Sequence, residues 1–64
     1  MAGLRETMKL RRRTSVLAAS ERLFRDKGYT QTSIEEISRA AEVSIGTLYK
    51  YFGSKSGILS ELFR

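Results

Sequence analysis

The strongest constraint on the fold lies in the stretch 33–52, SIEEISRAAEVSIGTLYKYF. Its first half has apolar or small residues at i, i+3, i+4 and i+7, which predicts one buried face on a short helix: Ile34, Ile37, Ser38 and Ala41. The pattern breaks at positions 42–44, and Ser44 can cap a second helix by accepting a hydrogen bond from an amide of its first turn. Two short helices with a tight turn between them predict a helix-turn-helix, although periodicity alone equally fits an ordinary helical hairpin.

The second of these helices, over residues 44–51, has two contrasting sides. At about 100° per residue, Ile45, Leu48 and Phe52 fall close together on the side that would face the core. The opposite side is small or polar and is flanked by two phenols: Gly46, Thr47 and Lys50, with Tyr49 and Tyr51. A face with so little bulk suits close docking into a groove of another molecule.

A set of short motifs runs through the chain in order: Gly28-Tyr29, Thr32-Ser33-Ile34, Ile37, Ala41, Val43-Ser44, Gly46-Thr47-Leu48-Tyr49, Tyr51-Phe52 and Ser54-Lys55. With this set, roughly residues 10–64 resemble the amino-terminal DNA-binding domain of the TetR family of transcriptional regulators. The resemblance implies an all-α fold, a small helical bundle with a three-helix helix-turn-helix domain over residues 10–53 and the start of a fourth helix over residues 54–64. It also implies that residues 44–51 are the recognition helix, which enters the major groove of double-stranded DNA.

The same resemblance implies properties of a longer protein. Family members act as homodimers, mostly as repressors, on palindromic operators, and a small-molecule effector releases them from DNA. Their effector-binding and dimerisation domain follows the fourth helix and is absent from this sequence, so we expect the chain to be a truncated head. The operator, the effector and the choice between repression and activation stay open.

Basic residues are concentrated near the amino terminus. Residues 1–13 carry five cations and one carboxylate, so they hold most of the formal net charge of +5. Such an excess attracts DNA or an anionic membrane surface, and the charge count does not separate these partners. We expect a flexible basic arm over residues 1–9 and a first helix from about Leu10, with Arg11 to Arg13 either in its first turn or in the arm.

Composition argues against several classes of function. The chain has no Cys and no His, which removes thiolate metal sites and the commonest general base, so we expect no metal and no cofactor. No nucleophile, base or metal set converges at reactive spacing, so we expect no enzyme. The longest apolar run is far too short for a membrane span, which favours a cytoplasmic protein without a membrane partner.

Helix boundaries can be read from capping residues. The first helix should bury a stripe of five residues and end at Lys27, because Gly28 suits a left-handed C-terminal cap. The stripe consists of Val16, Ala19, Ser20, Leu23 and Phe24. Thr32 with Glu35, or Ser33 with Glu36, can form a capping box at the start of the second helix, while Gly53 and Ser54 separate the third helix from the fourth.

Two positions depart from what the local structure favours. Similar sequences usually have Gly where this chain has Glu42, and a left-handed residue other than Gly costs about 1 to 2 kcal/mol there. The turn is therefore expected to be loose or strained. Gly57 in the first turn of the fourth helix should weaken that helix by about 1 kcal/mol.

Candidate base contacts lie on the exposed side of the recognition helix. Lys50 can donate to guanine and Thr47 suits several base edges, while Gly46 would let the helix backbone approach DNA closely. Tyr49 and Tyr51 can donate hydrogen bonds to phosphates while their rings close the edges of the core. Each of these residues can also belong simply to a solvated face or to the packing of the domain.

Other candidates lie at helix ends and in the basic segment. Helix N-termini bind phosphate, so Thr32, Ser33 and Ser44 join the expected DNA-binding residues, although the hydroxyls can also serve only as caps. Helical geometry places Ile45 near the core, whereas the resemblance places it against DNA, where it can touch a thymine methyl.

Three cations complete the set of expected DNA-binding residues. Lys55 matches the family lysine that contacts a phosphate of the DNA backbone. Arg11 and Arg12 can lie along a phosphate strand or enter a minor groove, or they can be only a solubilising segment.

Two alternatives to DNA binding remain. A basic helical peptide on an anionic surface would explain the arginines, but such helices carry cations along the polar face, and here the second and fourth helices carry Glu35, Glu36 and Glu61. A protein-interaction module that uses the end of the fourth helix is the other alternative.

Overall fold

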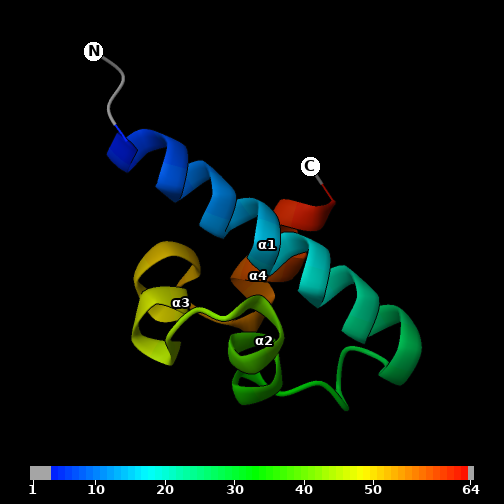
Figure 1. The fold of residues 1–64 in the computed structure, drawn as a ribbon. Coiled ribbons are helices and arrows are strands. Elements are labelled where there is room, and N and C mark those ends of the chain that lie inside the picture. Colours follow the sequence, from blue (N-terminus) through cyan, green and yellow to red (C-terminus); the bar gives the residue numbers. More distant parts are fainter. Residues whose placement is uncertain (1–3, 64) are drawn as a thin grey trace.

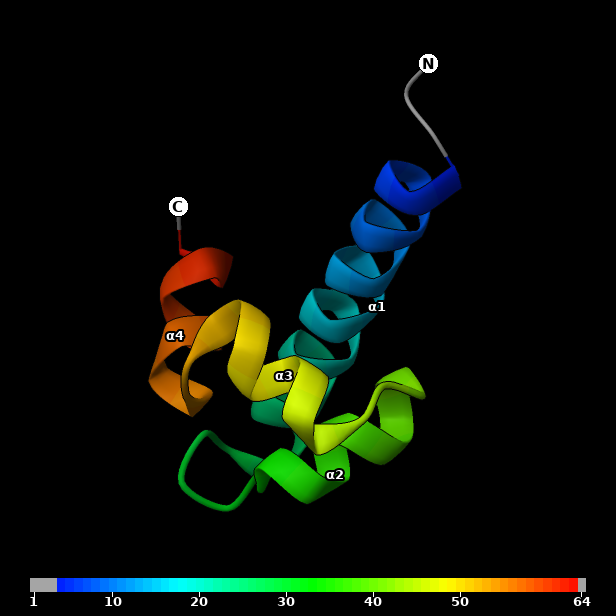
Figure 2. The ribbon, with the colours of Figure 1, turned by 90° about the vertical axis from the view of Figure 1, so that its left-hand side faces the viewer.

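The computed structural model describes the backbone of residues 4–63 and the side chains of residues 10–63. Four helices follow one another over these residues: α1 (Leu4–Lys27), α2 (Ile34–Ala41), α3 (Ile45–Phe52) and α4 (Lys55–Leu62). The long α1 crosses the three short helices, and its amino-terminal turns extend beyond them (Figure 1). Turned by 90°, the view shows α2 and α3 meeting at their connecting turn (Figure 2). The predicted all-α helix-turn-helix bundle is confirmed.

One cluster of four aliphatic side chains forms the core. Val16, Ile37, Leu48 and Ile58 are buried, and each comes from a different helix. Burying a side chain of this kind stabilises the fold by about 1.5 to 3 kcal/mol. Partly buried apolar residues pack around the cluster: Leu17, Leu23, Phe24, Ile34, Ala41, Val43 and Phe52. The predicted stripe on the first helix is confirmed, since its members are buried or pack against this cluster.

The start of the first helix differs from the prediction. The helix was expected from about Leu10, after a flexible arm over residues 1–9, whereas α1 begins at Leu4. Apolar periodicity is absent from residues 4–13, but these residues are mainly strong helix formers without Gly or Pro. Helix propensity and continuity with the packed part of α1 therefore extend the helix beyond the core. Residues 1–3 of the expected arm lie outside the described residues.

Serine side chains cap all three short helices. Ser33, Ser44 and Ser54 are the N-cap residues of α2, α3 and α4, and each hydroxyl accepts a backbone hydrogen bond at 3.1 Å. At α2 the capping box is complete, because the Ser33 amide also donates to the Glu36 carboxylate at 3.1 Å. The alternative box of Thr32 with Glu35 is wrong.

The turn between α2 and α3 is tight and left-handed. Glu42 has φ 55° and ψ 44°, the conformation for which Gly is favoured. Its amide donates to the Arg39 carbonyl at 3.3 Å, and the Val43 amide donates to the Ser38 carbonyl at 3.0 Å. The strain expected for a residue other than Gly is therefore present at Glu42, and the turn stays tight.

Gly57 has a packing role that the sequence did not predict. A Cβ atom built at this position would lie 1.9 Å from the carbonyl oxygen of Phe52. Real Cβ atoms essentially never approach so closely, so any larger residue would push α4 away from the end of α3. The glycine lowers helix propensity, but it permits the close approach of these two helices.

We predict that Glu42→Gly raises the free energy of unfolding by roughly 0.5 to 1 kcal/mol, because relief of the left-handed strain exceeds the entropy that Gly adds to the unfolded chain. Urea unfolding followed by circular dichroism measures this change. Ala40→Gly, at an exposed position of α2, is the matched control and should lower stability by about 1 kcal/mol. A loss of stability in Glu42→Gly would contradict the assignment of strain.

Candidate nucleic-acid interface

The outward face of α3 is open. Leu48 is buried, which turns the opposite side of the helix to solvent and leaves Ile45, Tyr49 and Tyr51 exposed by 40%, 51% and 43%. The helical-wheel expectation that Ile45 faces the core is wrong, because Val43 packs against the core in its place. Lys50 is also exposed, and its ammonium lies 5.8 Å from the centre of the Tyr51 ring.

Gly46 lies in the first turn of this face, with empty space in front of it. A Cβ atom added there would meet no heavy atom within 4 Å. The fold therefore does not require a glycine at this position, in contrast to Gly57. The helix backbone at Gly46 is therefore accessible to another surface.

Two hydroxyls at the start of α3 are paired with each other. The oxygen atoms of Ser44 and Thr47 lie 2.8 Å apart, and the Thr47 amide donates to the Ser44 hydroxyl at 3.1 Å. Thr47 is half-buried, so its hydroxyl is less accessible than the Lys50 ammonium. The structure therefore gives the Ser44 hydroxyl a capping role, and the Thr47 hydroxyl is paired with it.

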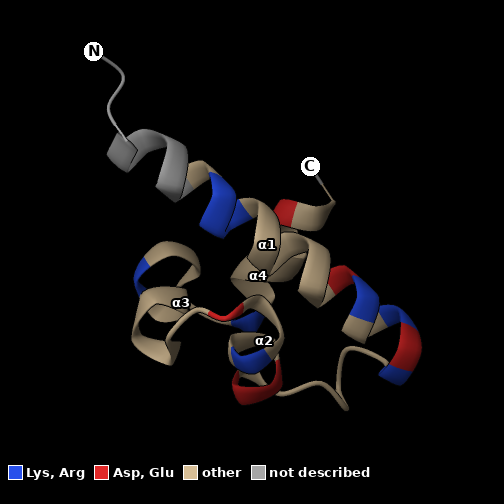
Figure 3. Cartoon of the chain, viewed as in Figure 1, with Lys and Arg blue, Asp and Glu red and all other residues tan. Residues whose placement is uncertain are grey.

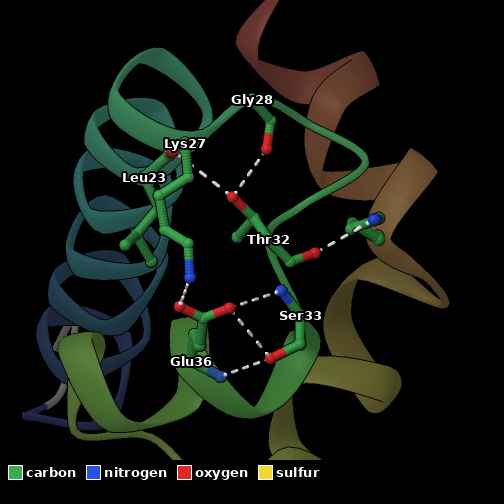
Figure 4. Close-up of polar contacts among 7 residues, drawn as sticks. Leu23, Lys27, Gly28, Thr32, Ser33 and Glu36 are labelled. Atoms are coloured by element: carbon green, nitrogen blue, oxygen red, sulfur yellow. Dashed lines mark hydrogen bonds and ion pairs between the residues drawn. The ribbon is translucent and has the colours of Figure 1, made fainter.

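The start of α2 is held by the contacts shown in Figure 4. Thr32 is 1% exposed, and its hydroxyl donates to the carbonyl oxygen of Gly28 at 2.9 Å and lies 3.3 Å from that of Leu23. The Thr32 side chain is therefore buried inside the loop, and not at the surface where a contact with DNA was expected. Ser33 is exposed at the N-cap, where its hydroxyl closes the capping box.

Glu36 is turned toward α1, away from the solvent side of α2. Its carboxylate forms an ion pair with Lys27 and also accepts a hydrogen bond from the Ser33 amide. The Lys27 ammonium, followed by the Ser33 amide, lowers the pKa of Glu36 below its ordinary value of 4.5. The ion-pair partner of this carboxylate therefore comes from a different helix.

The Lys55 ammonium, which was expected to contact a phosphate, is hydrogen-bonded within the protein. Its Nζ atom donates to the carbonyl oxygens of Tyr29 at 2.8 Å and Thr32 at 3.0 Å. The same atom lies 4.3 Å from the centre of the Tyr29 ring. These partners are more than twenty residues away in the chain, and no local pattern in the sequence could have indicated them.

The expected DNA-binding arginines lie within α1 and not in a loose arm. Arg11 and Arg12 are exposed, whereas the neighbouring Arg13 forms an ion pair with Glu61 of α4. A groove lined by Leu10, Arg13, Tyr51 and Phe52 places this part of α1 beside the end of α3. Figure 3 shows the basic segment of α1 and the basic end of α3 on the same side of the molecule.

Other kinds of site find no support among the residues that the structure describes. Among the side chains of residues 10–63, no group of three or more acidic, His or Cys residues could hold a metal ion. None of the helices described is both long and apolar enough to cross a membrane. The exposed groups near α3 are hydroxyls, phenols and cations, which bind phosphates and base edges.

Comparisons with known proteins give a consistent result. The sequence profile described as "Bacterial regulatory proteins, tetR family" matches residues 16–62. The transcriptional regulator HbdR of Aromatoleum sp. is 46% identical over 48 residues, which are 75% of this chain and 21% of that protein. A transcriptional repressor of Rhodococcus jostii is 36% identical over 53 residues, or 83% of this chain and 26% of that protein.

A third relative extends the same picture. The regulator AcrR of Shigella flexneri is 39% identical over 51 residues, which are 80% of this chain and 24% of that protein. This chain therefore spans about a quarter of the length of these relatives. No solved structure matches the chain significantly.

We predict that Glu36→Gln changes the pH dependence of stability. Because the pKa of Glu36 is lowered in the folded chain, its contribution is present above the ordinary value of 4.5 and is lost as the pH falls through the lowered pKa. The variant should therefore be less stable at neutral pH and lose less stability on acidification. Urea midpoints from neutral pH down to about pH 3 measure this. Glu35→Gln, at an exposed position without an ion pair in the described residues, should keep the original profile.

Proposed function

Because this chain belongs to the TetR family of bacterial regulatory proteins, we propose that it binds a specific double-stranded DNA operator with α3 in the major groove. The observation that carries the proposal is the exposed face of α3, on which a glycine with open space in front of it stands beside an exposed lysine. A major groove admits one α-helix, and side chains of that helix read the base edges.

The residues divide into base contacts and phosphate contacts. Lys50 donates to guanine, and Ile45 packs against a thymine methyl at the exposed first turn of α3. The Gly46 backbone approaches the groove closely between them. Thr47 and Ser44 contribute through their shared hydroxyl pair while Ser44 caps the helix.

Phosphates are contacted from three elements. Tyr49 and Tyr51 donate their exposed phenol hydroxyls, and the exposed Ser33 end of α2 offers the positive end of its helix dipole. The ion pair of Glu36 with Lys27 supports this proposal, because it neutralises one carboxylate near that end. Arg11 and Arg12, on the α1 surface beside the end of α3, reach the flanking backbone.

The full-length protein is a cytoplasmic repressor in this proposal. It dimerises through a further domain, binds a palindromic operator with two heads, and leaves it when a small molecule binds that domain. The name of the Rhodococcus jostii relative supports repression. A groove between α1 and α4 supports contact with further protein. Its apolar lining consists of Phe24, Leu59, Leu62 and Phe63, of which the last is 81% exposed, and the ion pair of Glu21 with Arg25 lies beside them.

We predict that the chain binds duplex DNA with a strong salt dependence. If one head neutralises about four to six phosphates, the slope of log K against log salt concentration is roughly −4 to −5. Fluorescence anisotropy with a labelled duplex, selected from a random library, measures the slope. Vesicles containing phosphatidylserine provide the comparison, because a membrane-surface peptide would bind them. A flat salt response, or preference for the vesicles, would contradict DNA binding.

We predict that Gly46→Ala separates binding from folding. The added methyl group meets open space in the free chain, and Ala is the better helix former, so the free energy of unfolding should stay constant or rise by up to about 1 kcal/mol. Affinity for the selected duplex should fall by about tenfold or more, the scale of one lost base contact. Ser60→Ala, at an exposed position of α4, is the control and should leave the affinity unchanged. Equal affinity for Gly46→Ala and the unmodified chain would rule out close approach at this residue.

A further inference from the structure

The position of Lys55 is electrostatically unfavourable unless contacts within the protein stabilise its positive charge. It is the first residue of α4, where the positive end of the helix dipole disfavours a cation. Its Nζ atom lies 2.8 Å and 3.0 Å from two carbonyl oxygens of the loop before α2, those of Tyr29 and Thr32. The ring of Tyr29 also faces the ammonium at 4.3 Å, within the range of a cation–π contact.

The peptide unit between Thr32 and Ser33 is thereby held from both sides. Its carbonyl oxygen accepts from Lys55, and its N–H donates to the Glu36 carboxylate at 3.1 Å. Glu36 in turn pairs with Lys27 at the end of α1. Figure 4 shows the Ser33, Glu36 and Lys27 part of this network. Three helices therefore meet through one peptide group.

This network connects the two segments proposed to contact DNA. Ser33 caps α2, and Lys55 follows the end of α3 after only Gly53 and Ser54. A contact from Lys55 to the residue before Ser33 therefore limits how far the start of α2 can move relative to the end of α3. The two segments must be correctly spaced to contact one duplex together.

We infer that Lys55 is a positioning residue, whose ammonium holds the loop before α2 in place instead of binding a DNA phosphate. Two of its three N–H donors are used by carbonyl oxygens, and the aromatic ring takes a further side of the cation. The part of this inference that concerns affinity rests on the proposed function. The contact itself can be tested in the free chain.

A double-mutant cycle on the free chain tests the contact without DNA. Each single variant, Lys55→Met or Tyr29→Leu, should lower the folding equilibrium constant by some factor. Because both variants remove the same contact, the product of these two factors should exceed the factor for the double variant by at least about twofold. Arg39→Met, at an exposed position of α2, replaces Lys55→Met in the control cycle and should show no coupling with Tyr29→Leu. Absence of coupling between Lys55 and Tyr29 would overturn the inference.

The unmodified chain provides a second test that does not depend on whether Lys55→Met folds. In the nuclear magnetic resonance spectrum, the ring of Tyr29 should shift the proton resonances of the Lys55 side chain beside Nζ upfield from those of Lys27, for which the described residues show no aromatic ring beside the ammonium. The shift should disappear in Tyr29→Leu. Unshifted Lys55 resonances in the unmodified chain would overturn the inference.

Titration with the selected duplex distinguishes positioning from direct phosphate contact. We expect Lys55→Met to weaken binding at every salt concentration while the slope of log K against log salt stays that of the unmodified chain. A lysine that neutralised a phosphate would instead reduce the magnitude of the slope by about 0.9. Such a reduction, or an unchanged affinity, would overturn the inference. Failure of the unmodified chain to bind any duplex would defeat the proposed function, and the coupling in the free chain would still decide the contact.

Discussion

The burial of one aliphatic side chain from each helix is the constraint on which the structure depends. Three of the helices have only eight residues, and isolated helices shorter than about 12 to 15 residues are marginal in water. Ile37, Leu48 and Ile58 therefore anchor their helices on Val16 of the long helix α1. Without this shared cluster, no short helix has enough intrinsic stability to hold a defined position.

The same constraint determines which surface is available for function. Leu48 can be buried only if the opposite side of α3 points to solvent, and that side carries Gly46, Lys50 and the flanking tyrosines. Burial sets the rotation of α3 about its axis. The ion pair of Glu36 with Lys27 holds α2 on α1, and the contacts of Lys55 hold the start of α4, just after α3, on the loop before α2. Core and binding face are thus two sides of one eight-residue helix.

Features governed by local rules could be predicted from the sequence. The N-caps at Ser33, Ser44 and Ser54 depend on hydrogen bonds within three residues. The left-handed turn at Glu42 was instead indicated by the resemblance, because similar sequences usually have Gly there. The start of α1 was missed because its first turns follow helix propensity and make no periodic apolar contact.

Contacts between distant parts of the chain could not be predicted in this way. The buried Thr32 hydroxyl, the Lys55 ammonium and the pair of Arg13 with Glu61 all depend on how the helices come together, and so does the need for Gly57. In the candidate interface, the exposure of Tyr49, Lys50 and Tyr51 agrees with the prediction, whereas the helical wheel misplaced Ile45. Their contacts with DNA stay predictions. The side chains of Thr32 and Lys55, which were expected to contact DNA, form hydrogen bonds within the fold.

The central claim is that the face of α3 set by the burial of Leu48 is the surface that meets DNA. Titrating the isotope-labelled chain with the selected duplex, and following each backbone amide by nuclear magnetic resonance, tests it most directly. The account predicts the largest changes at residues 44–50 and at the start of α2, with little change around Phe24 and Leu59 on the opposite groove. Changes concentrated around Phe24 and Leu59, with the amides of α3 unaffected, would contradict it.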